Sequence, residues 1–181
     1  MRLDLKRIAS KKGESIVSAV ASTSFDTRSP VLRSIAIGGS IIFVAQLIQS
    51  WLVYSVLQGT PFFIVLQYMA SGALGESVFT GGTATALLGV LFHLVISFVI
   101  AAVFILSANR IPLLRRYVIA GALVYGFGVW VVMHLIVLPL SAAPPVPAPT
   151  TPWLIEEIVE HILVVGLPLG ILVQRDAAIN K

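Results

Sequence analysis

Long apolar stretches constrain this chain more than any other feature of its sequence. Four of them are long enough to cross a hydrocarbon core about 30 Å thick, which takes about 20 helical residues. They run over residues 34–57, 83–108, 117–140 and 153–174. Only 11% of the 181 residues are charged, whereas an average soluble domain carries about a quarter. The sequence therefore predicts an all-α, polytopic membrane protein whose residues 34–174 form a bundle of four transmembrane helices.

The basic residues predict how these helices are oriented. All 12 lysines and arginines lie in the segments 1–33, 109–116 and 175–181, and the positive-inside rule places such segments in the cytoplasm. We therefore expect both termini inside, with 1–33 as a basic cytoplasmic tail and 175–181 as a short one. Anionic lipid headgroups at the cytoplasmic face are sufficient partners for this charge, so no nucleic-acid partner is expected.

The two loops on the outer side contain no basic residue and differ in character. The first contains an apolar run, 61–74, which opens with Thr60-Pro61 and is followed by a cluster of glycines. If this run crossed the membrane, the basic segment 109–116 would move outside, so we expect a short interfacial or re-entrant helix instead. The second loop, 141–152, contains five prolines, which predict an extended strap with few backbone donors.

Several polar side chains interrupt the spans at a similar depth. An ionisable group costs roughly 2.5–3.5 kcal/mol at the bilayer centre and therefore calls for a partner or a function. At about 1.5 Å per residue, His93, His134 and His161 lie roughly 9–14 Å below the outer ends of their helices. We expect them to meet in one polar layer in the outer half of the bilayer, with Glu156 left at headgroup level. The other expected members of this layer are Glu157, Glu160, Gln46, Gln49 and Ser50.

Small residues indicate which helix faces pack, because helices in lipid associate through small side chains and polar contacts. On the second span, one helix face carries a stripe of small residues, and His93 lies on that face. On the third span, the corresponding stripe contains Gly126 and leads to His134. On the fourth span, Gly166 and Gly170 lie opposite His161, counting about 100° per residue. They predict ordinary packing within the chain or a homodimer seam, and both remain open.

The polar layer has three functional interpretations and a structural one, in which its members only bond one another and hold the bundle together. In the first, His93, His134 and His161 bind haem or a divalent metal, with Glu157 or Glu160 as an oxygen ligand. In the second, the layer holds a quinone headgroup or another small polar ligand. In the third, Glu157 and His161 relay protons from the outer surface, in a small proton-coupled transporter that acts as an oligomer.

The sequence contains none of the motifs that would indicate catalysis. A Ser/His/Asp arrangement, an H-E-x-x-H zinc motif and a phosphate-binding loop are all missing. The lack of cysteine excludes disulfides and thiolate metal sites. We therefore expect a non-enzymatic binding or accessory protein whose first partner is the lipid bilayer, and the proton-coupled transporter is the alternative.

The second half of the chain contains a series of short motifs. They are FHLVISFVIA at 92–101, IAGAL at 119–123, MHLIVLPL at 133–140, APPV at 143–146, PW at 152–153 and EH at 160–161. In order and spacing, over about residues 92–176, they resemble the YagU family of small bacterial inner-membrane proteins. The resemblance implies one histidine in each of the last three helices, at His93, His134 and His161, and a place in the bacterial cytoplasmic membrane. It implies no activity.

Overall fold

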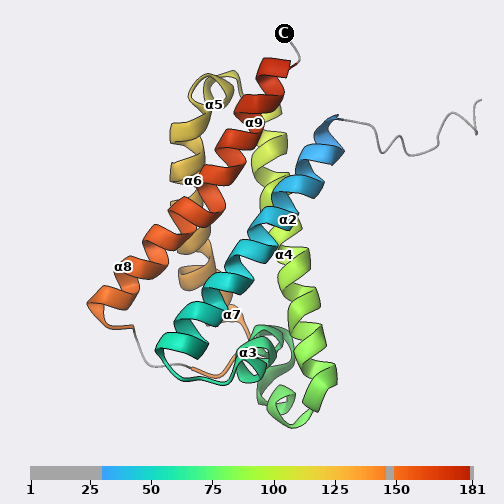
Figure 1. The fold of residues 1–181 in the computed structure, drawn as a ribbon, viewed down its shortest axis with the longest axis vertical. Coiled ribbons are helices and arrows are strands. Elements are labelled where there is room, and N and C mark those ends of the chain that lie inside the picture. The colour runs from blue at the N-terminus through green and yellow to red at the C-terminus, as the bar shows by residue number, and fades with distance from the viewer. Residues whose placement is uncertain (1–29, 146–148, 180–181) are drawn as a thin grey trace, which may run out of the picture. The chain divides into compact units, whose positions relative to one another are not determined.

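The computed structural model describes residues 30–145 and 149–179, with side chains as far as Asp176. Most of the expected basic tail, part of the proline-rich strap and the end of the C-terminal tail lie outside the described residues. The chain divides into two compact units, Met1–Arg33 and Ser34–Lys181. Helices form all of the regular structure in the described residues, as Figure 1 shows, so the all-α prediction is confirmed.

Several of the α-helices continue directly into π-helical turns, which contain one more residue than an α-helical turn. The elements in chain order are α2 (Pro30–Ser50), a π-helical segment (Trp51–Leu57), α3 (Phe62–Leu74), a 3₁₀ segment (Gly75–Thr80), α4 (Gly82–Arg110), α5 (Pro112–Arg116), α6 (Val118–Val132), a second π-helical segment (Met133–Val137), α7 (Leu138–Leu140), α8 (Thr151–Glu160), a third π-helical segment (His161–Gly166) and α9 (Leu167–Ile179). Because the segments run on without a break, α8, the third π-helical segment and α9 form one long helix.

In the part of the chain that the structure describes, four helices are long and apolar enough to cross a membrane, and the chain is accordingly a multi-pass helical membrane protein. They are Pro30–Leu57, Phe62–Thr80, Gly82–Arg110 and Val118–Leu140. Three of them coincide with the first three expected spans. The remaining one contains the helix that we expect to be interfacial or re-entrant, and the expected span 153–174 is not among the four.

The two segments that differ from expectation have different structures. Phe62–Thr80 is not one regular helix, because α3 ends at Leu74 and Gly75, at a φ of 69°, begins the 3₁₀ segment. The 13 residues of α3 are about 20 Å long, less than the thickness of a hydrocarbon core. The expected span 153–174 lies in the long helix that starts at Thr151, and three of the first ten residues of that helix are glutamates.

Prolines account for two of the π-helical segments. A proline inside a helix loses one hydrogen bond, and its ring clashes with the carbonyl group four residues earlier. A wider turn just before the proline relieves this clash. Pro139 follows the segment Met133–Val137, and Pro168 follows His161–Gly166. Both π-helical segments therefore have a local cause that is visible in the sequence.

Glycines bring α6 close to the last long helix. A Cβ atom on Gly126 would lie 2.5 Å from the His161 carbonyl oxygen and 3.1 Å from the Gly166 Cα, and one on Gly170 would lie 2.8 Å from the Ala122 Cβ. Gly166 and Gly170 therefore pack within the chain, against the helix that His161 also faces. The prediction that they lie opposite His161 is wrong, because the π-helical turn breaks the constant angular step on which it rests.

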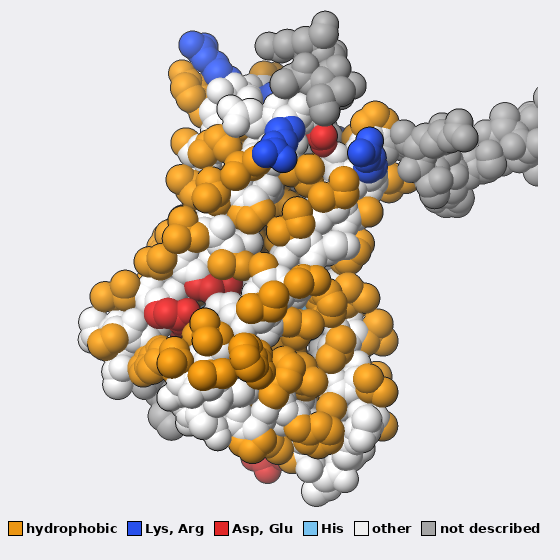
Figure 2. All heavy atoms as spheres, in the orientation of Figure 1, with side chains coloured by type: hydrophobic (Ala, Val, Ile, Leu, Met, Phe, Trp, Pro, Cys, Tyr) orange, Lys and Arg blue, Asp and Glu red, His pale blue; other side chains and the backbone are white. Residues whose placement is uncertain are grey.

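The helix ends gather at two opposite ends of the bundle (Figure 1). The short helix α5 lies at one end of the bundle with the C-terminal ends of α4 and α9, whereas α3 and the start of α8 lie at the other end. The end of the bundle that contains α5 carries all the arginines of the unit Ser34–Lys181, which are Arg110, Arg115, Arg116 and Arg175. On the face drawn in Figure 2, hydrophobic side chains cover the middle of the molecule, and acidic side chains on the α8 flank interrupt them.

Candidate functional site

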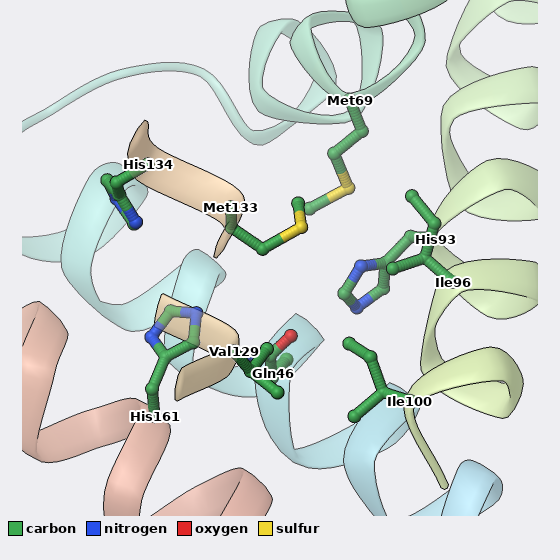
Figure 3. A pocket seen from close by; sticks show the side chains of 9 residues that line it. All are labelled: Gln46, Met69, His93, Ile96, Ile100, Val129, Met133, His134 and His161. Carbon is green, nitrogen blue, oxygen red and sulfur yellow. The ribbon is translucent and has the colours of Figure 1, made fainter. Parts of the chain in front are cut away.

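A cavity of about 200 Å³ lies where α2, α3, α4, α6 and the last long helix meet. Its lining residues are Gln46, Met69, His93, Ile96, Ile100, Val129, Met133, His134 and His161 (Figure 3). The structure thus places all three predicted histidines around one cavity. Figure 3 shows His134 and His161 on one wall and His93 on the opposite wall, with Met69 and Met133 between them.

Two carboxylate–imidazole pairs occupy the wall next to α8. The Nε2 atom of His134 lies 3.3 Å from the Oε2 atom of Glu157, and the Nδ1 atom of His161 lies 2.7 Å from the Oε2 atom of Glu160. The two imidazole rings meet edge to face, with their centroids 5.9 Å apart. The wall therefore contains a row of four titratable groups in the order Glu157, His134, His161 and Glu160.

Helix α2 supplies two amide donors to the carboxylates. The Nε2 atom of Gln46 donates to the Oε1 atom of Glu160 at 3.1 Å, and the Nε2 atom of Gln49 donates to the Oε1 atom of Glu156 at 3.0 Å. Glu156 is therefore bonded to the polar layer through α2, and its place at headgroup level stays a prediction. Ser50 is buried at the end of α2 and makes none of these bonds.

Backbone carbonyls restrict the proton positions on two of the imidazoles. The Nδ1 atom of His161 lies 2.8 Å from the Glu157 carbonyl oxygen as well as beside Glu160, so it faces two acceptors and carries a proton. The Nδ1 atom of His134 lies 3.1 Å from the Trp130 carbonyl oxygen. His134 thus has a possible acceptor near each nitrogen, the Trp130 carbonyl oxygen at Nδ1 and the Glu157 carboxylate at Nε2.

Three buried polar atoms around the layer have no hydrogen-bond partner among the described residues. They are His93 Nε2, Trp130 Nε1 and Glu157 Oε2. The Glu157 atom is close to His134, but the contact lacks hydrogen-bond geometry. An unpaired buried polar atom costs about 1–3 kcal/mol. The layer is therefore not fully satisfied by the protein's own groups, which argues for water or a ligand beside it.

The described side chains do not form the metal or haem site that the sequence left open. In residues 30–145 and 149–176, no group of three or more His, Asp or Glu side chains is placed to hold a metal ion. The predicted ligands were His93, His134, His161, Glu157 and Glu160. Glu160 is engaged with His161, and His93 stands on the far wall. The cavity of about 200 Å³ is also smaller than the 300–1,000 Å³ or so of drug-sized sites, so a haem does not fit.

Some features of the site are absent from the sequence-based prediction. Met69 comes from α3 and lines the cavity, and no sequence pattern placed α3 at this depth. The Trp130 ring stacks on His134 with centroids 4.9 Å apart. His134 and His161 both lie in π-helical segments, which occur frequently at functional sites. The prolines that follow these segments, Pro139 and Pro168, are the sequence signal that could have revealed them.

Comparison with known proteins identifies no relative. No protein-family model, no curated protein and no solved structure matches this chain. The similarity to the YagU family therefore depends only on the short motifs in residues 92–176, and membership of that family stays a prediction.

Proposed function

We propose that this protein is a non-enzymatic binding protein of the bacterial cytoplasmic membrane that holds the ring of a lipid-soluble ligand, of the quinone-headgroup class, in the histidine-lined cavity. The observation that carries the proposal is the cavity itself. Imidazoles stand on two opposite walls, and the Nε2 atom of His93 is buried without a partner. A ligand with a polar oxygen at each end of a flat ring would complement both walls.

The size of the cavity suits one ring. An engineered cavity of about 150 Å³ binds benzene, and this cavity measures about 200 Å³. It therefore has room for a six-membered ring with small substituents. Met69, Met133 and Val129 would contact the ring, and thioether sulfur makes favourable contacts with flat ring systems.

The chemistry of the walls suits a ligand with oxygens on opposite sides of its ring. A quinone in its reduced, quinol form is uncharged and has two hydroxyl groups, each of which can donate or accept. The imidazoles of His93 and His161 line facing walls. The Nδ1 proton of His161 is held by Glu160 and the Glu157 carbonyl group, so the Nε2 atom of the neutral ring accepts a hydrogen bond from such a hydroxyl group. Such a ligand would reach the cavity from the hydrocarbon phase, because Ile96 lines the cavity and is itself exposed on the lipid-facing surface.

We also propose the membrane topology that places this cavity in the outer half of the bilayer. The spans are α2 with its π-helical extension, α4, α6 through α7, and the long helix from Thr151, and both termini are cytoplasmic. The grouping of Arg110, Arg115, Arg116 and Arg175 at one end of the bundle supports this orientation. The shortness of α3 and its position at the other end support a re-entrant helix on the outer face.

Binding of a short-chain benzoquinone, kept in its reduced quinol form, to the purified protein in nanodiscs tests the ligand proposal. A ligand that binds only the folded state raises its stability by about 2.7 kcal/mol at a concentration of 100 Kd. We expect a thermal shift for the native chain, a smaller one for His93→Leu, and none for Val129→Phe, which fills the cavity. Val132→Phe is the matched control, because Val132 lies on the same helix and faces lipid with 46% of its surface exposed.

Two results would contradict the proposal. One is the lack of any shift in the native chain at saturating quinol. The other is equal binding by Val129→Phe and Val132→Phe, which would place the ligand outside the cavity. In either case the cavity would be a water site, and the polar layer would serve the packing of the bundle.

A further inference from the structure

The ionisable side chains of the described helices are distributed unevenly along the bundle. Those within the proposed spans gather in the polar layer, which contains His93, His134, His161, Glu156, Glu157 and Glu160. Along the last long helix, the next ionisable residue after His161 is Arg175, 14 residues and about 21 Å away. Along α4, the next one after His93 is Arg110, about 25 Å away. In the described part of the chain, the inner half of the bundle therefore offers almost no proton-carrying side chains.

One phenol lies in that inner half, and it does not extend the layer. The hydroxyl group of Tyr125 donates to the Ile100 carbonyl oxygen at 2.8 Å. A hydroxyl with its proton held by a backbone carbonyl is a poor link in a proton path. The polar groups at the inner end, including the hydrogen bond from Ser34 to Asp176, are separated from the layer by apolar residues.

We propose that the polar layer is a proton half-channel, which exchanges protons between the cavity and the outer aqueous phase but does not carry them across the membrane. The inference concerns the Glu157–His134–His161–Glu160 row and holds whatever ligand occupies the cavity. It separates this protein from a proton-coupled transporter, which needs a path from the layer to both faces.

The outer end of the layer provides the entrance. Glu156 and Glu157 lie five and six residues after Thr151, the first residue of α8, or about 8–9 Å along the helix. Both side chains are partly exposed, and acidic side chains reach the surface on this flank (Figure 2). No described lysine or arginine lies in the layer, so its carboxylates face only imidazoles and the amides of Gln46 and Gln49.

The geometry of the two carboxylate–imidazole pairs allows stepwise transfer. Glu157 takes up a proton from outside, and its Oε2 atom lies 3.3 Å from the Nε2 atom of His134, which accepts the proton once the two side chains align as a hydrogen bond. Both His134 and His161 line the cavity, so a water molecule there can accept this proton and donate one to the Nε2 atom of His161. His161 then releases its Nδ1 proton to the Oε2 atom of Glu160, 2.7 Å away. One proton enters and one reaches Glu160, and only N–H and O–H bonds form or break.

Trp130 can report on the protonation of this row. Its ring stacks on His134 at a centroid distance of 4.9 Å, and an imidazolium in contact with an indole quenches its fluorescence. Replacing Trp51 and Trp153 with Phe leaves Trp130 as the single tryptophan. The full chain with these two changes would be placed in liposomes containing an internal pH dye. A cysteine at Gln58, in a chain without native cysteine, would allow capture of the vesicles whose outer face points outward.

We expect Trp130 emission to fall when the external pH is lowered and to remain unchanged when only the internal pH is lowered. The internal dye should show no faster loss of a pH gradient than in protein-free vesicles. His134→Gln should abolish the emission response, and Glu157→Gln, which keeps the side-chain shape, should shift its midpoint. Emission that follows the internal pH, emission that ignores both pH values, or gradient loss that requires the protein would each overturn the proposal.

Discussion

Gly126→Ala tests the close approach on which the geometry of the site depends. Gly126 lies in α6 where this helix meets the π-helical segment His161–Gly166. An added methyl group would lie 2.5 Å from the His161 carbonyl oxygen, 3.0 Å from the Ile162 Cα and 3.1 Å from the Gly166 Cα. All three are backbone atoms, so no side-chain rotation can relieve the contacts.

The size of the effect follows from these distances. Carbon atoms pack best at about 3.5–4.0 Å, and a gap of 0.5–1 Å forfeits a quarter to a half of the contact energy. The two helices would have to separate by roughly this amount, and overpacking of this kind typically costs about 1–3 kcal/mol. Alanine also favours the helix over glycine by up to about 1 kcal/mol, which offsets part of the loss.

Gly128→Ala is the matched control for this change. Gly128 lies two residues further along α6, and an added methyl group there meets nothing within 4 Å. The gain in helix propensity is the same for both variants, so their difference isolates the contact. We expect Gly126→Ala to be less stable than Gly128→Ala by about 1–3 kcal/mol, measured by equilibrium unfolding in mixed detergent micelles and followed by circular dichroism. Equal stability of the two variants would refute the close approach of α6 to His161.

Three further predictions concern other parts of the bundle. Cysteine at Gln58 should react with an impermeant thiol reagent on intact cells and cysteine at Asn109 only after lysis; labelling of Asn109 on intact cells would contradict the topology. Glu160→Leu should lower the free energy of unfolding by about 3–5 kcal/mol, because it breaks the buried pair of Glu160 and His161. Glu160→Gln should lower it less, because the amide oxygen can still accept from Gln46. Similar losses for the two variants in chemical denaturation would argue against the pair. Gly89→Ala should destabilise more than Gly128→Ala in the same assay, because its methyl group would collide with the Leu66 carbonyl group of α3, and a neutral result would mean that α3 is not held against α4.

Much of the fold is predictable from properties that every membrane helix shares. A fixed rise per residue and a fixed hydrocarbon thickness determine which segments can span and how deep a residue lies. This is why the sequence predicts the helices at 34–57 and 83–108 and assigns His93, His134 and His161 to a similar depth. The structure places these three histidines around one cavity. Lengths and depths along an isolated helix need no knowledge of its neighbours.

The pairing of groups within the layer depends on how each helix is rotated and how closely it approaches the next. Counting along α8 puts Glu157 one turn before His161, yet the Glu157 carboxylate lies beside His134, and Glu160 pairs with His161. Two π-helical turns change the angular position of every residue that follows them, and Gly126 sets the distance between the helices. Because these are relations between helices, only the tertiary structure decides which carboxylate meets which imidazole and brings Met69 of α3 to the cavity.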